Sequence, residues 1–135
     1  DNWELSLRTL RLRLETRVSL FQPCTKFGVK MINALILSGQ GINSHVETAY
    51  AFEQGGANST IMDIEDFLRL ESLDDFHILA FPGGFSFGDE IRSGKLVAEK
   101  IKAHQSENIK KFIDAGKPII GICNGFQILV QLGVF

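Results

Sequence analysis

Cysteine is scarce in this chain of 135 residues, and long apolar runs are absent. The two cysteines, Cys24 and Cys123, stand far apart, which excludes the dense disulfide framework of small secreted domains. This pattern favours a reducing compartment, and we expect the cytoplasm. No apolar run approaches the roughly 20 residues that cross a bilayer, so we expect no membrane partner.

An excess of charge of one sign is also lacking. The chain has 14 Lys and Arg residues against 16 Asp and Glu residues, a formal net charge of −2. This balance gives no reason to expect a nucleic-acid partner. A composition with 44% hydrophobic and 22% charged residues is typical of a soluble globular protein, and the length fits one small domain.

The first thirty residues differ from the rest by their excess of basic side chains. The stretch "LRLRLETRVSL" alternates apolar and polar residues as a half-buried strand does, but a targeting segment or an extension without fixed structure is also compatible with it. We expect residues 1–30 to be an N-terminal extension outside the domain, and residues 31–135 to form the domain. Because the sequence starts at Asp1 and stops at Phe135, just after a helical pattern, we expect it to be a piece of a longer protein.

Short apolar runs alternate with helical patterns from Met31 onward. The runs predict buried strands, and the amphipathic segments between them predict helices. We expect strands near 32–38, 58–63, 76–81 and 118–122, and helices near 44–56, 93–104, 107–116 and from 125 onward. This order predicts a three-layer α/β fold, a flavodoxin-like and mostly parallel sheet with helices on both faces.

Two details of this prediction concern helix boundaries. Ser44 and Glu47 have the spacing of a capping box, in which each side chain bonds a backbone N–H at the helix start. The segment "EDFLRLESLDD" is expected to be a short polar connection before the third strand.

The stretch "GICNG" places Cys123 between the fourth strand and the last helix, with glycines at −2 and +2. This is the cysteine form of a nucleophile elbow, in which a strained turn raises the reactive atom above the sheet. The positive end of the following helix favours a thiolate, and the Asn124 N–H can meet an oxyanion formed by its attack. The alternative is a structural cysteine at a strand end.

A glycine-rich loop follows the third strand, in "FPGGFSFGD". An elbow nucleophile needs a second oxyanion donor from the loop after a neighbouring strand, and Gly83 or Gly84 can bring a backbone N–H close to a reacting carbonyl. An ordinary glycine turn is the alternative. The two motifs together favour the catalytic interpretation.

The stretches "PGGFSFGDEIRSGK", "GKPIIGICNGFQILVQLG" and "GINSHVETAYAFEQGGA" closely resemble the class I, triad-type glutamine amidotransferases. Among these, the combination of "PGGFSFGD" with "CNGFQ" is most similar to the glutaminase subunits of phosphoribosylformylglycinamidine synthases, which act in purine biosynthesis. The resemblance covers about residues 31–135.

The resemblance implies a role for each matching residue. Cys123 would attack the side-chain amide of glutamine, form a glutamyl thioester and release ammonia. Gly84, with Gly83 beside it, and Asn124 would donate the oxyanion N–H groups, and Gln127 would help to hold the substrate. No metal site is expected.

The resemblance also implies partners. Ammonia would pass to a synthetase subunit, which would use it in the ATP-dependent conversion of formylglycinamide ribonucleotide to formylglycinamidine ribonucleotide. We expect no cofactor on this domain, with ATP and magnesium on the synthetase subunit. The resemblance leaves open whether a small accessory subunit also belongs to this complex.

One feature of the family pattern is missing. The family completes its triad with a His-x-Glu pair well beyond the elbow, and this sequence has no such pair there. His45-Val46-Glu47 has the right residues, but it lies at the start of the first helix. We therefore expect the chain to be inactive alone, because Cys123 has no visible general base.

Two other functions remain compatible with the residues. One is another cysteine-elbow hydrolase of the same broad fold. The other is a non-catalytic flavodoxin-like binding module that keeps the thiol for packing.

Overall fold

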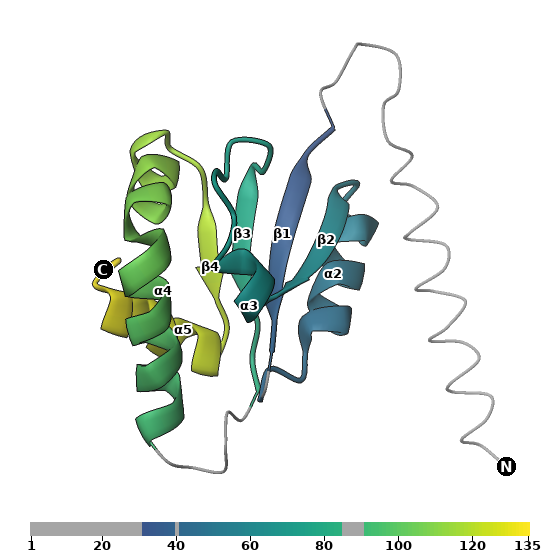
Figure 1. Cartoon of the computed structure of the whole chain (residues 1–135). Helices are drawn as coiled ribbons and strands as arrows, with labels where there is room; N and C mark the ends of the chain where they lie inside the picture. Colours follow the sequence, from purple (N-terminus) through teal and green to yellow (C-terminus); the bar gives the residue numbers. More distant parts are fainter. Residues whose placement is uncertain (1–30, 40, 85–90) are drawn as a thin grey trace, which may run out of the picture. The chain divides into compact units, whose positions relative to one another are not determined.

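The computed structural model describes residues 31–39, 41–84 and 91–135, with only the backbone described for residues 91–94. These residues form one four-stranded parallel sheet in the order β2-β1-β3-β4 (Figure 1). The strands are β1 (Asn33–Ser38), β2 (Asn58–Asp63), β3 (Ile78–Phe81) and β4 (Ile119–Gly121). Each lies within one or two residues of its predicted range, so the prediction of a parallel α/β sheet is confirmed.

β1, the first of the described strands, is an inner strand of the sheet. β1 pairs with β2 on one side, where Leu35 lies opposite Thr60, and with β3 on the other, where Leu35 lies opposite Leu79. Its residues Ala34–Leu37 have no exposed surface. The continuous apolar run of this strand therefore reflects burial on both faces.

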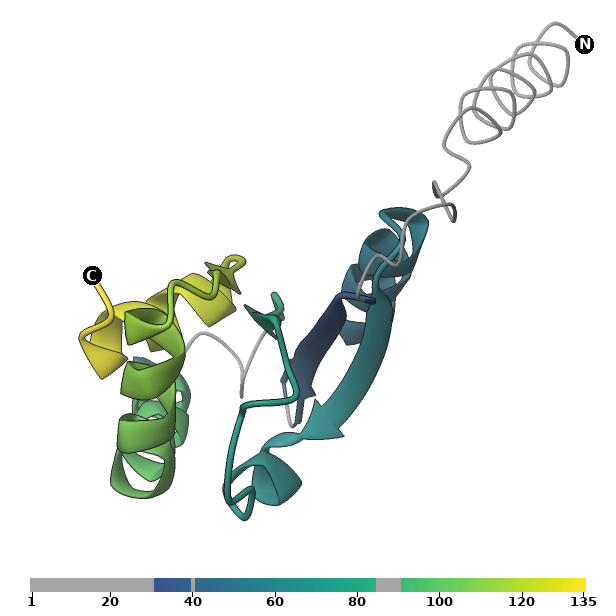
Figure 2. The same cartoon turned by 90° about the horizontal axis from the view of Figure 1, so that it is seen from above.

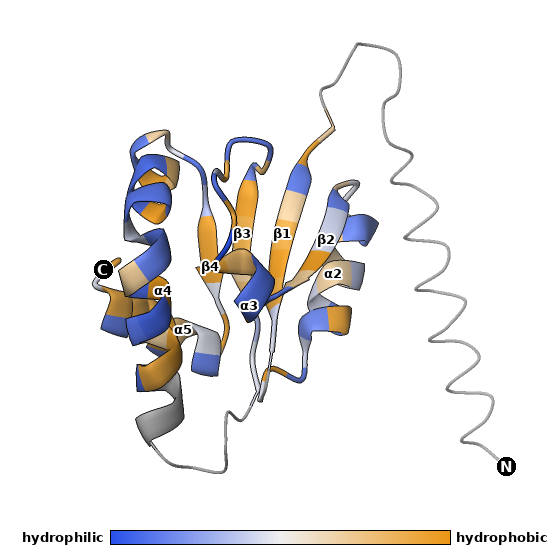
Figure 3. Ribbon diagram, viewed as in Figure 1, coloured by the Kyte–Doolittle hydropathy of each residue, from blue (hydrophilic) through white to orange (hydrophobic). Residues whose placement is uncertain are grey.

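The helices divide between the two faces of the sheet (Figures 1 and 2). They are α2 (His45–Gln54), α3 (Ile64–Phe67), α4 (Ile91–Asp114) and α5 (Asn124–Leu132). Ala34 and Ile36 of β1 pack with Ala49 of α2. Leu35 and Leu37, which point to the other face, join the larger core cluster with residues of α3, α4 and α5. In Figure 3, β1, β3 and β4 are mainly hydrophobic, whereas the helices carry both hydrophobic and hydrophilic residues.

The prediction of two separate helices near 93–104 and 107–116 is wrong, because α4 runs without a break from Ile91 to Asp114. The buried stripe of α4 continues through Ala98, Ile101, Gln105, Ile109 and Phe112. Its middle member is polar, so the apolar periodicity is interrupted although the helix is not.

Gln105 explains why that polar position is buried. Its side-chain Nε2 donates to the carbonyl oxygens of Phe67 (2.8 Å), the last residue of α3, and of Leu70 (2.9 Å), shortly after it. Its Oε1 accepts a hydrogen bond from Asn108 at 2.9 Å. The segment expected to be a polar connection thus begins with a short helix, α3, and continues as turns, and amide groups fix it to α4. Phe67 and Leu73 from this segment also enter the core.

The order of the strands places a binding position at the sheet edge. From the adjacent strands β1 and β3, the chain moves outward in opposite directions, to β2 and to β4. In parallel α/β sheets, ligands bind beyond the carboxyl ends of the strands at such a point. Among the residues described, no helix is long and apolar enough to cross a membrane.

Candidate active site

Cys123 lies in the turn between β4 and α5, beyond the carboxyl edge of the sheet. Its backbone has φ 53° and ψ −114°, and it is the only non-glycine residue with positive φ among those described. Non-glycine residues rarely adopt this backbone conformation because it is sterically strained. Residues strained in this way occur mostly at functional sites. The Cys123 side chain is exposed. A thiol held out in this way is available for reaction.

The two flanking glycines of "GICNG" are required by close packing. A Cβ atom at Gly125 would lie 1.9 Å from the carbonyl oxygen of Phe81. One at Gly121 would lie 2.6 Å from Leu129 Cδ1 and 2.8 Å from Phe126 Cα. The first contact joins the start of α5 to the end of β3, and the second joins β4 to α5. The glycines therefore let the strands and the helix approach closely enough to form the turn.

Hydrogen bonds fix the turn on both sides of the cysteine. The Ile122 N–H donates to the Phe81 carbonyl oxygen at 3.0 Å, and the Gly125 N–H donates to the Ile122 carbonyl oxygen at 2.9 Å. The Gln127 N–H donates to the carbonyl oxygen of Cys123 at 3.2 Å, which closes the first turn of α5. The strained backbone is thus held by bonds from its neighbours.

The Pro82–Gly84 loop lies beside the elbow. A Cβ atom at Gly83 would lie 3.4 Å from Cys123 Cβ and 3.5 Å from the Ile122 carbonyl oxygen. At Gly84 a Cβ atom would lie 2.0 Å from the carbonyl oxygen of Gly41, so only glycine fits there. The structure therefore brings the glycine loop after β3 next to Cys123. Residues 85–90, the rest of "FPGGFSFGD", lie outside the described residues.

Ser44 is a neighbour of this loop, although its position before α2 predicts a helix cap. Its side chain makes no capping hydrogen bond with α2, so the predicted capping box is wrong. The Ser44 hydroxyl instead donates to the carbonyl oxygen of Gly83 at 2.8 Å. The backbone N–H groups of Asn43 (3.1 Å) and Ser44 (3.2 Å) donate to the same oxygen. A serine before a helix is usually a cap, so no local pattern indicates this contact.

Asn124 and Gln127 both belong to α5. Asn124 is the first residue of the helix and is buried, and Gln127 lies about one turn further and is exposed. Their expected roles, an oxyanion N–H for Asn124 and substrate contact for Gln127, stay predictions.

The three histidines each use Nδ1 in a contact with the backbone. His45 Nδ1 lies 3.0 Å from the Ile42 carbonyl oxygen and His104 Nδ1 lies 3.0 Å from that of Lys100, so each of these nitrogens donates. His77 Nδ1 accepts a hydrogen bond from the Asn33 N–H, near the amino ends of β1 and β3. His77 is thus placed at the sheet edge opposite Cys123.

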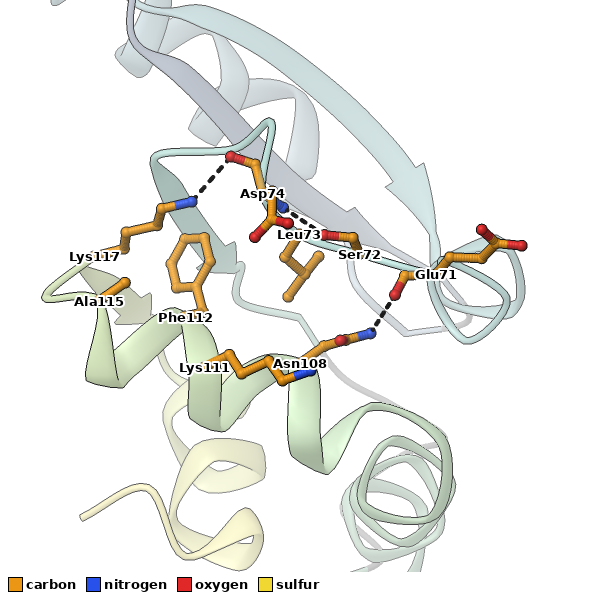
Figure 4. A pocket seen from close by; sticks show the side chains of 9 residues that line it. All are labelled: Glu71, Ser72, Leu73, Asp74, Asn108, Lys111, Phe112, Ala115 and Lys117. Atoms are coloured by element: carbon orange, nitrogen blue, oxygen red, sulfur yellow. Dashed lines mark hydrogen bonds between the residues drawn. The ribbon is translucent and has the colours of Figure 1, made fainter.

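A pocket of about 190 Å³ lies away from the elbow, between the segment before β3 and the last turns of α4 (Figure 4). Two hydrogen bonds connect its walls. Asn108 Nδ2 donates to the Glu71 carbonyl oxygen (3.2 Å), and Lys117 Nζ donates to the Asp74 carbonyl oxygen (3.0 Å). These bonds join α4 and the turn between α4 and β4 to the chain before β3. In the described part of the chain, no three His, Cys, Asp or Glu side chains gather as a metal site would require.

Comparison with known proteins identifies the family. The model of the CobB/CobQ-like glutamine amidotransferase domain matches residues 31–135. Phosphoribosylformylglycinamidine synthase subunit PurQ of Methanococcus maripaludis is 47% identical over 102 residues, which is 75% of this chain and 38% of that protein. The corresponding subunit of Dehalococcoides mccartyi is 42% identical over 104 residues, 76% of this chain and 41% of that protein.

A solved structure agrees with these relatives. The structure of PurLQS from Thermotoga maritima contains a chain that is 33% identical, with a TM-score of 0.63 over 78% of this chain and 46% of that chain. The chain thus spans 38% and 41% of the length of the two curated relatives and 46% of the solved one. Both the elbow and the glycine loop lie within the matched range, and the chain belongs to the CobB/CobQ-like glutamine amidotransferase family.

Proposed function

We propose that this chain is the nucleophile-bearing part of the glutaminase component of phosphoribosylformylglycinamidine synthase. The observation that carries the proposal is the strained, exposed Cys123 at the carboxyl edge of the sheet, with Gly83 against it. The likeness to the PurQ subunits and to the PurLQS structure supports the choice among amidotransferases. Exposure of the thiol argues against the alternative of a binding module that keeps the cysteine for packing.

The proposed chemistry begins with attack of the Cys123 thiolate on the side-chain amide carbon of glutamine. A C–S bond forms, and the carbonyl electrons move to oxygen, where the N–H groups of Gly84 and Asn124 stabilise the negative charge. Gln127 contacts the substrate. The C–N bond then breaks, and the leaving nitrogen takes a proton to become ammonia. Water hydrolyses the thioester to glutamate and restores the thiol.

The ammonia is proposed to serve a synthetase subunit. There it replaces the amide oxygen of formylglycinamide ribonucleotide, with ATP consumed to activate that oxygen as a leaving group. ATP and magnesium belong to the synthetase, and glutamine is the ligand of this chain. Residues 1–30 are proposed to be an extension outside the domain.

The test of the glutaminase assignment uses a reactive analogue. The chain is incubated with the diazoketone analogue of glutamine, 6-diazo-5-oxo-L-norleucine, and the adduct is located by mass spectrometry. We expect one adduct on Cys123, with loss of N₂, that excess L-glutamine suppresses and L-asparagine does not. Cys123→Ala is the control. A Cys123 that glutamine does not protect would favour another cysteine-elbow hydrolase.

The pathway assignment is tested with a complete glutaminase subunit that contains this chain. It is mixed with a synthetase subunit, formylglycinamide ribonucleotide and ATP, and product formation is measured. Cys123→Ala should abolish glutamine-dependent product and leave ammonia-dependent product unchanged. Loss of both activities would contradict the proposed division of labour.

A further inference from the structure

The Gly83–Gly84 peptide unit is held from one side by the chain just before α2. Three donors converge on the Gly83 carbonyl oxygen: the N–H groups of Asn43 and Ser44, and the Ser44 hydroxyl. Both lone pairs of the oxygen are therefore engaged. The hydroxyl bond, at 2.8 Å, is the shortest of the three.

The planarity of the peptide unit transmits this anchor to the next N–H group. The described chain has no cis peptide bond, so the Gly83 C=O and the Gly84 N–H point in opposite directions. A carbonyl fixed toward Asn43 and Ser44 therefore directs the Gly84 N–H away from them. The unit has no room to shift toward the chain before α2, because a Cβ atom at Gly84 would lie 2.0 Å from the Gly41 carbonyl oxygen and 2.7 Å from Ile42 Cα.

Glycine at both positions makes an external anchor necessary. Two consecutive glycines have a wide choice of backbone conformations, and the peptide between them rotates readily. An oxyanion donor is effective only when it is oriented before the charge develops. Something outside the loop must therefore hold the unit, and Ser44 contributes the only side-chain bond to the Gly83 oxygen in the described chain.

We infer that Ser44 is a positioning residue, whose hydroxyl sets the direction of the Gly84 N–H in the loop that lies beside Cys123. The inference rests on the proposed function, because the direction of the Gly84 N–H matters only if a carbonyl substrate forms an oxyanion there. Ser44 does not touch the reacting atoms. It is also free for this role, since its side chain makes no capping bond to α2.

Two electrophiles distinguish an effect on the Gly84 N–H donor from an effect on the reactivity of the Cys123 thiol. The γ-(p-nitrophenyl) ester of glutamate acylates a thiolate through an oxyanion, and its leaving group departs as a phenolate without needing a proton. Iodoacetamide alkylates the same sulfur with loss of iodide and forms no oxyanion. In Ser44→Ala we expect acylation of Cys123 to slow about fivefold or more, which is the value of one lost hydrogen bond, while alkylation keeps its rate.

Matched variants and a second readout complete the test. Ser44→Thr retains a hydroxyl and should restore most of the acylation rate. Ser72→Ala, which removes a hydroxyl that accepts from the Asp74 N–H at the far edge of the sheet, should change neither reaction. Amide exchange of Gly84, followed by NMR, should become faster in Ser44→Ala only.

The outcomes decide between the two proposals. Equal slowing of both electrophiles, or an unchanged acylation rate in Ser44→Ala, would overturn the role of Ser44. Failure of the unsubstituted chain to be acylated would count against the proposed glutaminase function. In that case Gly84 exchange still decides the anchor, which an unchanged exchange rate in Ser44→Ala would refute.

Discussion

At the scale of single residues, the glycines of the elbow carry a steric requirement that can be measured. Gly125→Ala would place a Cβ atom 1.9 Å from the Phe81 carbonyl oxygen, so α5 must move away from β3. We expect the free energy of unfolding to fall by about 3 kcal/mol, the upper range for an overpacked site. Urea denaturation of residues 31–135 measures it.

Gly56→Ala is the matched control for that substitution. Gly56 has φ +87° but no atom within 4 Å of its Cβ position. Only backbone strain should appear, about 1 kcal/mol. Equal losses in the two variants would mean that contact with Phe81 does not constrain the elbow.

The strain at Cys123 predicts an unusual order of stability. At φ 53° glycine is relaxed, whereas alanine keeps the steric conflict. We expect Cys123→Gly to be more stable than Cys123→Ala by about 1 kcal/mol, the reverse of the usual effect of glycine. The midpoints of urea denaturation give the comparison. An alanine variant that is the more stable would show that the turn relaxes once the thiol is gone.

At the scale of elements, Gln105 fixes α3 to α4, and a substitution can test this bridge. Gln105→Leu keeps a large side chain but leaves the carbonyl oxygens of Phe67 and Leu70 without this donor. We expect a loss of about 2 kcal/mol in the free energy of unfolding, the cost of unsatisfied buried acceptors. Gln131→Leu on the exposed side of α5 is the control and should change stability little. Similar effects of both would contradict the bridging role.

A second link between the same helices responds to pH. Lys100 Nζ lies 2.8 Å from Glu65 Oε1, and this hydrogen bond, together with the positive charge of Lys100, lowers the pKa of Glu65. A lowered pKa means that the contribution to stability is present above the ordinary pKa of glutamate and is lost as the pH falls through the lowered value.

Lys100→Met should therefore raise the pKa of Glu65 toward its ordinary value and remove this acid-sensitive contribution. An NMR titration of the Glu65 carboxyl carbon follows the change directly. A midpoint that stays where it is would assign the shift to other groups, such as Arg69 and His104.

The sequence predicted the strands, and it predicted the position of Cys123, because both depend on local patterns. Short apolar runs indicate buried strands, and glycines two positions before and after Cys123 indicate an elbow. It did not predict that α4 is continuous, because a buried amide at Gln105 looks like a break in an apolar stripe. It missed the contact of Ser44 with Gly83 for a similar reason, since the partner lies 39 residues away and leaves no local signal.

At the scale of the whole molecule, we expect residues 31–135 to release no glutamate from glutamine on their own. Turnover needs a group that takes the thiol proton and later protonates the departing nitrogen. The family resemblance assigns this task to a His-x-Glu pair after the elbow, and His45 Nδ1 already donates to the Ile42 carbonyl oxygen. Loss of one triad member costs several orders of magnitude in rate.

Glutamate release is measured for residues 31–135 beside Cys123→Ala. The two rates should agree. A rate well above the control would show that a base is already present, and His45→Gln would then test whether it is His45.

The inner position of β1 has a consequence for synthesis on the ribosome. Of the described strands, β1 is the first to leave it. Its partner β2 follows by Asp63, but its other partner, β3, ends only at Phe81, and α4 and α5 on its far face follow later still. At roughly 5–20 residues per second, Ser38 waits about 2–9 seconds for the end of β3. During that time the side of the apolar segment "NALILS" that pairs with β3 stays open, and this is the kind of segment that pairs with other chains. Nascent copies of this protein should therefore depend on chaperones until β3 has emerged.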